Sequence, residues 1–242
     1  PKVVVLFHES QRGRRVENSF VDGLAAEWRR RGLEVEFLYG VARRPAADLV
    51  VPHVDLTRTP PEYVAFLRTF PRVVNRDLLD ISKRVVSRQL VGPQDDVVGP
   101  VVLKTDLNYG GKPEERVERV RRPLYARLRR RLVPLVEALL RKPYAFRTTL
   151  DEYRVFARAS DVPPSARANP ALVLERFVPE RSGDRFFVRH YVFFGSRWLT
   201  SRVGGADPFV KRAHAVGAGR GFPPPPEVLA LRSELRADFG KI

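Results

Sequence analysis

The chain has 242 residues, of which 43% are hydrophobic and 30% are charged, and it contains no cysteine. This length is enough for one large domain or several small ones, and the missing cysteines exclude disulfide scaffolds, thiolate zinc sites and cysteine nucleophiles. The formal net charge of +16 raises the question of a polyanionic partner, but the basic residues are spread over the whole chain, which favours a generally arginine-rich surface.

No apolar run approaches the ~20 residues that a transmembrane helix needs, and the first apolar run is too short for a signal peptide. We therefore expect a cytoplasmic protein without a membrane span. The sequence also lacks methionine, including at position 1, so we expect a fragment or a processed copy.

The N-terminal part alternates short β-branched runs with segments of helical spacing. Gly32 ends the first helical segment, and a proline opens the second. This alternation predicts a small α/β layer domain with parallel strands over residues 1–72. Strands are predicted at 2–7, 33–39, 47–52 and 72–75, and helices at 16–31 and 60–69.

The rest of the chain is predicted as mixed helix and strand. Residues 114–140 form a highly charged helical stretch that Pro123 and Pro134 interrupt. A polar glycine-containing loop at 105–111 precedes it. The other predicted elements are helices at 77–90 and 227–239, strands at 101–104, 144–147, 153–157 and 172–178, and a hairpin of 184–194 with 197–203 around Gly195–Ser196.

The run VVLKTDLNYGGK, residues 101–112, places Lys104 at the end of an apolar strand with a glycine turn after it. A strand end fixes an ammonium group, and glycines let backbone N–H groups approach phosphate oxygens closely. The spacing is neither that of the Walker phosphate loop nor that of the dinucleotide fingerprint. Taken alone, this run is better explained as an ordinary strand and turn with a surface lysine.

The neighbouring motifs change this interpretation through their order. Upstream, VVNRDLLDISK carries Asn75 and Lys83, and downstream LVLERFVPE carries Glu175. Arg189 and Arg202 lie on the predicted hairpin that follows. This order resembles the ATP-grasp superfamily over residues 72–242, which implies an α/β chain whose α+β nucleotide-binding unit holds ATP between two antiparallel β layers.

The resemblance implies a site for ATP and Mg²⁺. Lys83 and Lys104 are similar in position to the two phosphate-binding lysines of the family, and Glu175 to the acceptor for the adenine amino group. Arg189 and Arg202 resemble the arginines that contact phosphate or acyl phosphate. The other implied positions are Asn108, Gly110 and Gly111 for the lid loop, Arg176, Phe177 and Val178 for the adenine edge, and Asp184 or Glu180 for the ribose.

The same resemblance implies an ATP-grasp domain at 73–242, with a lid subdomain at about 92–172. The magnesium ligands of the family lie on strands that would follow Ile242, so the metal ligands are unknown here. Asp238 is better explained as a helix-end carboxylate. The basic helical insertion at 114–147 departs from the family, because it is longer and more basic than a minimal lid needs.

The apolar positions of this insertion share one helical face. We expect that face to pack on the lid beneath a solvated basic face. Alternatively, residues 116–141 contact an acidic partner such as nucleic acid, anionic lipid or a polyanionic substrate. Tyr125 is the only aromatic residue between 114 and 142, so the interleaved aromatics of single-strand binders are missing.

The activity implied is an ATP- and magnesium-dependent ligase reaction. A small-molecule or peptide carboxylate is activated as an acyl phosphate, which an amine or another nucleophile captures. Two lysines and two arginines suit this chemistry, because phosphoryl transfer depends on positioning and charge stabilisation. Two alternatives stay open, namely a non-catalytic basic protein that binds nucleic acid or another polyanion, and a small-molecule kinase on the same fold.

Overall fold

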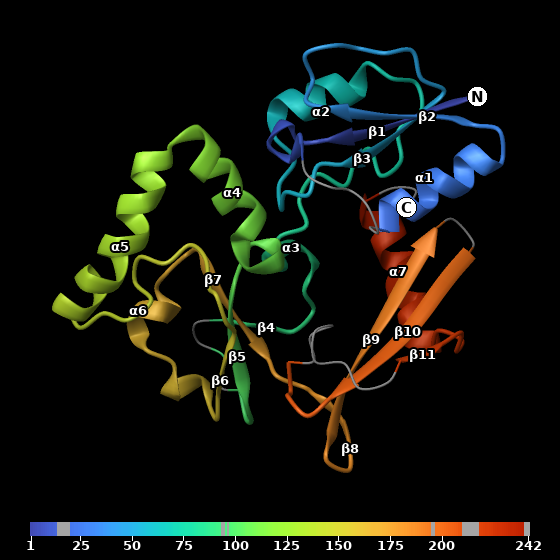
Figure 1. Cartoon of the computed structure of the whole chain (residues 1–242). Helices are drawn as coiled ribbons and strands as arrows, with labels where there is room; N and C mark the ends of the chain where they lie inside the picture. Colours follow the sequence, from blue (N-terminus) through green and yellow to red (C-terminus); the bar gives the residue numbers. More distant parts are fainter. Residues whose placement is uncertain (14–19, 93–94, 96, 195–196, 210–217, 240–242) are drawn as a thin grey trace. The chain divides into compact units, whose positions relative to one another are not determined.

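The computed structural model describes residues 1–13, 20–92, 95, 97–194, 197–209 and 218–239. The chain forms two compact units, Pro1–Phe177 and Val178–Ile242. Helices and strands mix along the chain, which confirms the α/β class (Figure 1). No described helix is long and apolar enough to cross a membrane. The domain boundary near residue 72 stays a prediction.

The first sheet of the N-terminal unit is parallel, as predicted, with the strand order β2-β1-β3. Its central strand is buried on both faces, because Val4 and Leu6 pack with α2 while Val5 and Phe7 pack with α1. Burial on both faces is typical of parallel strands. The elements are β1 (Lys2–Phe7), α1 (Phe20–Arg30), β2 (Glu34–Tyr39), β3 (Leu49–His53) and α2 (Pro61–Arg68).

The predicted strand at 72–75 is present only as a single bridge between Val50 and Val73. The predicted start of the first helix, residues 16–19, lies outside the described residues.

The second sheet of this unit is antiparallel, with the order β4-β7-β5-β6. Val101 and Leu103 face a core that also contains Leu172 and Leu174. Because side chains alternate along a strand, Lys104 and Glu175 belong to the opposite face. The strands are β4 (Leu90–Val91), β5 (Val101–Thr105), β6 (Arg154–Phe156) and β7 (Leu172–Arg176).

The predicted helix at 77–90 is wrong, since the structure contains only the short helix α3 (Lys83–Val86). The backbone before α3 is paired elsewhere: the Thr59 N–H donates to the Leu79 carbonyl (2.8 Å) and the Ile81 N–H to the Thr57 carbonyl (2.9 Å). In addition, the Asp80 carboxylate accepts the Ser82 N–H (2.7 Å). Such side-chain bonds compete with the helical pattern.

The predicted strand at 144–147 is also wrong, because these residues form a turn. Tyr144 has a left-handed φ of 67°. The Asn169 side-chain amide donates to the carbonyls of Tyr144 (2.7 Å) and Arg147 (2.8 Å), which ties both ends of the turn to one side chain.

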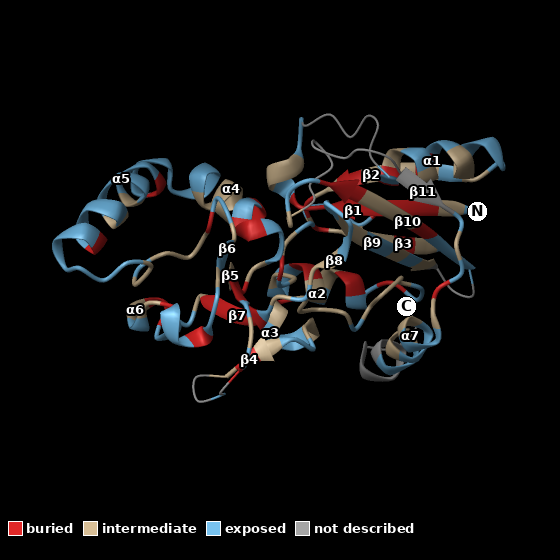
Figure 2. Cartoon of the chain, turned by 90° about the horizontal axis from the view of Figure 1, so that it is seen from below, coloured by how far each residue is buried: buried red, intermediate tan, exposed pale blue. Residues whose placement is uncertain are grey.

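The charged stretch forms two helices, α4 (Lys112–Arg121) and α5 (Pro123–Leu139). Pro123 is the first residue of α5, where a backbone N–H would have no acceptor within the helix. Pro134 lies inside α5 without ending it. The expectation that the apolar face packs on the lid is wrong. Figure 2 shows α5 exposed over most of its surface, and its leucines are at least half exposed.

The remaining short elements of this unit are one-turn helices. They are η1 (Glu9–Gln11), η2 (Asn108–Gly111), η3 (Ala159–Asp161) and α6 (Pro164–Arg167).

The C-terminal unit contains an antiparallel sheet with the order β11-β10-β9-β8. The predicted hairpin is confirmed by the pairing of β9 with β10. The proline block opens the last helix, as predicted, although its Asp238 side chain lies outside the described part. The elements are β8 (Glu180–Ser182), β9 (Arg185–Phe194), β10 (Arg197–Gly205), β11 (Ala218–Arg220) and α7 (Pro226–Phe239).

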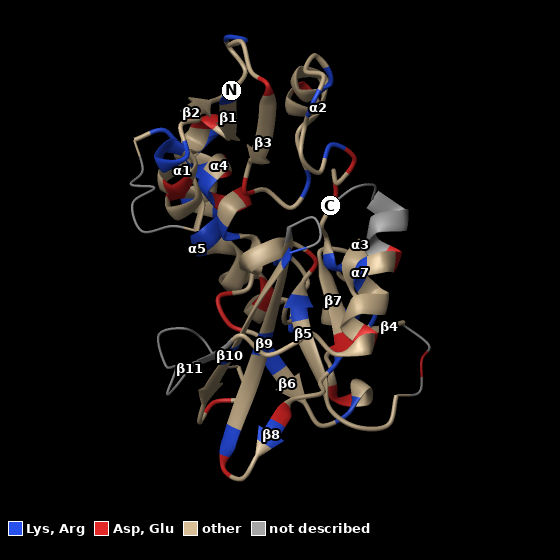
Figure 3. Cartoon of the chain, turned by 90° about the vertical axis from the view of Figure 1, so that its right-hand side faces the viewer, with Lys and Arg blue, Asp and Glu red and all other residues tan. Residues whose placement is uncertain are grey.

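Lysine and arginine occur on elements throughout the chain (Figure 3), in agreement with their spread along the sequence.

Candidate functional site

Lys104 and Glu175 meet on one face of the antiparallel sheet. Glu175 lies opposite Val102, and Lys104 lies opposite Val173, so the lysine and the glutamate are diagonal neighbours on β5 and β7. The Lys104 ammonium forms an ion pair with the Glu175 carboxylate. Glu175 is buried, which makes this carboxylate dependent on the cation beside it.

Lys83 joins the pair from α3. Its backbone N–H donates to the Asp106 carbonyl (3.0 Å), and its ammonium donates to the Leu107 carbonyl. Burial lowers the pKa of Lys83, and nearby Lys104 lowers it further, while Glu175 opposes the shift. The Glu175 carboxylate is therefore paired with Lys104, and its charge also acts on Lys83. We call Lys83, Lys104 and Glu175 the lysine–glutamate cluster.

Tyr153 is a fourth member of this environment that the sequence did not single out. The Lys104 ammonium lies 5.5 Å from the centre of its ring. Burial raises the pKa of the Tyr153 hydroxyl, and the negative charge of Glu175 adds to the shift. Tyr153 directly precedes β6, and no sequence motif includes it.

The position of Lys83 is fixed by Asp106, which sequence reasoning also missed. Asp106 directly follows β5, and its buried carboxylate accepts the Arg84 N–H (2.9 Å). The Arg58 guanidinium bridges Asp106 (3.3 Å) and Asp80 (2.9 Å). These bonds connect the segment after the parallel sheet to α3 and to the end of β5.

The predicted glycine loop is a tightly packed turn. Tyr109, Gly110 and Gly111 have left-handed φ values of 48°, 69° and 76°. A Cβ atom on Gly111 would lie 2.8 Å from the Thr149 Cγ2 atom, and one on Gly110 would lie 3.0 Å from the Leu150 carbonyl oxygen. The glycines are thus required by packing, whatever ligand the loop contacts.

Asn108 begins this turn. Its N–H donates to the Thr57 hydroxyl (2.7 Å), and its side-chain carbonyl accepts the Tyr109 N–H (2.9 Å). The loop is therefore anchored to the segment that follows β3.

In the segment predicted for the adenine edge, residues 176–178, two backbone N–H groups already donate hydrogen bonds to other parts of the chain. The Arg176 N–H donates to the Gln89 carbonyl (2.8 Å), and the Phe177 N–H donates to the Pro100 carbonyl (2.9 Å). Val178 begins the C-terminal unit.

Earlier in the chain, Asn75 has a left-handed φ of 52°, and its buried Oδ1 has no hydrogen-bond partner among the described residues.

Arg189 and Arg202 form a second cluster, within the C-terminal unit. They lie directly opposite each other on β9 and β10. Both contact the Glu180 carboxylate: Arg189 through Nε (2.7 Å) and Nη2 (2.8 Å), and Arg202 through Nη2 (2.9 Å). This carboxylate relieves the repulsion between two like charges on neighbouring strands.

The electrostatics of this second cluster follow from the shared carboxylate. The hydrogen bond from Arg189 lowers the pKa of Glu180, and the same bond raises the pKa of Arg189. The Arg202 guanidinium lies 3.7 Å from the centre of the Phe187 ring, and its buried Nε has no partner among the described residues. Asp184 is exposed in the β8–β9 turn and stays a prediction for the ribose.

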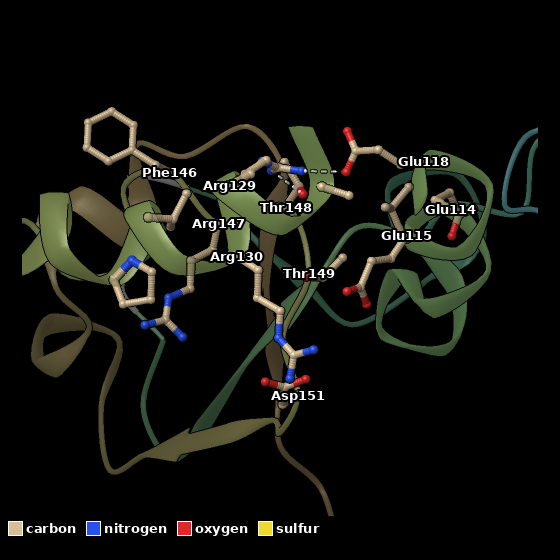
Figure 4. A pocket seen from close by; sticks show the side chains of 14 residues that line it. Glu114, Glu115, Glu118, Arg129, Arg130, Phe146, Arg147, Thr148, Thr149 and Asp151 are labelled. Carbon is tan, nitrogen blue, oxygen red and sulfur yellow. Dashed lines mark hydrogen bonds and ion pairs between the residues drawn. The ribbon is translucent and has the colours of Figure 1, made fainter. Parts of the chain in front are cut away.

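A pocket of about 380 Å³ lies between α4, α5 and residues 146–151 (Figure 4). Its lining mixes both charges, and Arg129 contacts Glu118 (3.3 Å) and the Thr148 hydroxyl. Glu114, another lining residue, accepts the Thr57 N–H through Oε1 (2.7 Å), while its buried Oε2 is unpaired in the described part. No sequence motif pointed to this pocket.

Within the described ranges, no three His, Asp or Glu side chains gather as metal ligands would. The predicted magnesium ligands were expected beyond Ile242, so they stay a prediction. No protein-family model, curated protein or solved structure matches the chain.

Proposed function

We propose that the chain binds ATP at the lysine–glutamate cluster and uses it, with Mg²⁺, to activate a carboxylate as an acyl phosphate that an amine or another nucleophile captures. The observation that supports this most is the convergence of Lys83, Lys104 and Glu175, which come from three separate elements. The resemblance of the motif order to ATP-grasp enzymes names the same three residues.

The charges of the cluster suit an anion that also offers a hydrogen-bond donor. Burial lowers the pKa of Lys83, so a phosphate oxygen nearby would stabilise the charged form of this lysine. Glu175 is acceptor-only when ionised, as an adenine amino group requires. ATP supplies the phosphoryl group and Mg²⁺ supplies positive charge for its transfer.

The other residues have supporting roles in this proposal. Tyr153 lies beside the Lys104 ammonium, and the strands that carry Lys104 and Glu175 are largely buried, which suits a reaction whose acyl phosphate must be kept from water. Asn108, Gly110 and Gly111 are proposed to contact phosphate, and residues 176–178 the adenine edge. Arg189 and Arg202 belong to the C-terminal unit, and their role as phosphate or acyl-phosphate contacts rests on the resemblance alone; within that unit Glu180 holds both guanidinium groups.

Thermal unfolding of the full chain with and without Mg–ATP tests the proposal. The parent chain is expected to be stabilised by Mg–ATP, and Lys104→Ala to lose most of that stabilisation. Lys142→Ala is the matched control, because Lys142 is an exposed lysine after α5. Equal stabilisation of the parent and Lys104→Ala would show that this lysine holds no nucleotide.

The reaction class is tested separately. ADP formed together with an amide or a similar ligated product supports the ligase reaction. ADP formed together with a stable phosphorylated small molecule would instead assign a kinase.

A further inference from the structure

Five leucines form a continuous exposed row along α5, which we call the leucine stripe. The exposed fractions are 76% for Leu124, 56% for Leu128, 51% for Leu132, 65% for Leu135 and 83% for Leu139. Their spacing of three or four residues places them on one side of the helix. Single exposed leucines are ordinary, but a row along a whole helix marks an interaction surface.

The opposite side of α5 is already packed, so the stripe is not a misplaced core face. Ala126 and Glu137 are buried there. The Glu137 carboxylate binds the Arg147 guanidinium (2.8 Å) and accepts the Phe146 N–H (3.2 Å). These contacts fix the rotation of the helix, and that rotation turns the leucines outward.

Arginines border the stripe without acidic partners. Arg127 and Arg131 are separated by one helical turn and lie next to the leucines in the helical arrangement. Both are exposed, and neither has an ion pair among the described residues. The only acidic residue of α5 is Glu137, which faces the other way.

An exposed row of leucines bordered by arginines fits one kind of partner better than the others. A second copy of α5 would bring arginine opposite arginine with no acid between them. A nucleic acid would neutralise the arginines but leave the leucines in water. A protein partner would have to supply a groove for a single convex helix. A bilayer with anionic headgroups needs no groove and accepts both an apolar row and a cationic border.

We propose that α5 docks the N-terminal unit on a membrane surface bearing anionic lipid headgroups. The leucine stripe enters the boundary between headgroups and acyl chains, and Arg127 and Arg131 contact lipid phosphates. This is peripheral attachment, independent of the reaction proposed above.

The test is flotation of the full chain with phosphatidylcholine vesicles, with and without phosphatidylserine. The parent chain binds the anionic vesicles, and added salt weakens binding. Leu128→Ser with Leu135→Ser lowers the partition coefficient at least about tenfold, because two exposed apolar side chains no longer enter the bilayer. Arg127→Gln with Arg131→Gln lowers it by about fivefold for each arginine removed.

The matched control is Arg68→Gln with Arg72→Gln, which removes the same charge from exposed positions outside α5 and leaves binding near that of the parent. Since the leucines are exposed, the leucine variant keeps the parent melting temperature. Equal vesicle binding by the leucine variant and the parent would overturn the proposal. Two results in a parent chain that does not bind vesicles would also overturn the proposal. One is a dimer that depends on the leucines, and the other is salt-sensitive RNA binding that is unchanged in the leucine variant.

Discussion

Replacing Gly111 by alanine should destabilise the N-terminal unit more than replacing Gly32, which has nearly the same φ but open space around it. Gly111 has a φ of 76°, and its new Cβ would meet the Thr149 Cγ2 atom at 2.8 Å and the Leu107 Cδ1 atom at 3.0 Å. The left-handed backbone costs an alanine about 1–2 kcal/mol, and overpacking adds roughly 1–3 kcal/mol. We therefore expect a total loss of about 2–5 kcal/mol in the free energy of unfolding.

Gly32 provides the control for the backbone contribution. Its φ is 79°, but a Cβ there would have nothing within 4 Å. Gly32→Ala should therefore lose only about 1–2 kcal/mol. Urea unfolding followed by circular dichroism measures both losses. Equal losses for the two variants would refute the packing argument.

Two further predictions concern charge. Glu175→Gln removes the carboxylate that pairs with Lys104 and the negative charge that acts on Lys83, so it should lower the stability by about 1–3 kcal/mol in urea unfolding. Glu27→Gln, which breaks an exposed pairing with Arg30 and Arg31, should have a much smaller effect, and equal effects would contradict the burial argument. Burial lowers the pKa of His8 and of His53 below the ordinary value of 6.5, so the unfolded chain binds more protons below that pH and stability falls as the pH falls. The melting temperature should drop between neutral pH and the lowered pKa values, and His8→Asn with His53→Asn should flatten this drop; an unchanged pH profile would contradict it.

Much of the secondary structure could be predicted because it depends on local pattern. The β-branched run at Val3–Phe7 identified β1, and two runs on either side of Gly195–Ser196 identified the hairpin of β9 and β10. The helix at 77–90 was wrong because the backbone around Asp80 pairs with residues 57–59, far away in the sequence. Helical spacing identified one apolar face of α5, but only tertiary contacts of Glu137 decide which side is packed.

In the candidate site, too, some residues could be predicted from the sequence and others could not. Lys83, Lys104 and Glu175 were found through the order of motifs, and the structure brings them together. Asp106 and Tyr153 were missed, because their importance arises from burial and from contacts across the fold. A polar residue after a strand carries no signal of its own in a single sequence.

The most direct test of the nucleotide site is calorimetric titration of Mg–ATP into the parent chain, Lys83→Ala, Lys104→Ala and the double variant. If both ammonium groups hold the same phosphates, each single variant loses most of the affinity, and the double variant loses much less than the sum of the two. Lys142→Ala should bind as the parent does. Parent-like affinity in both single variants, or no binding by the parent chain, would contradict the proposed site.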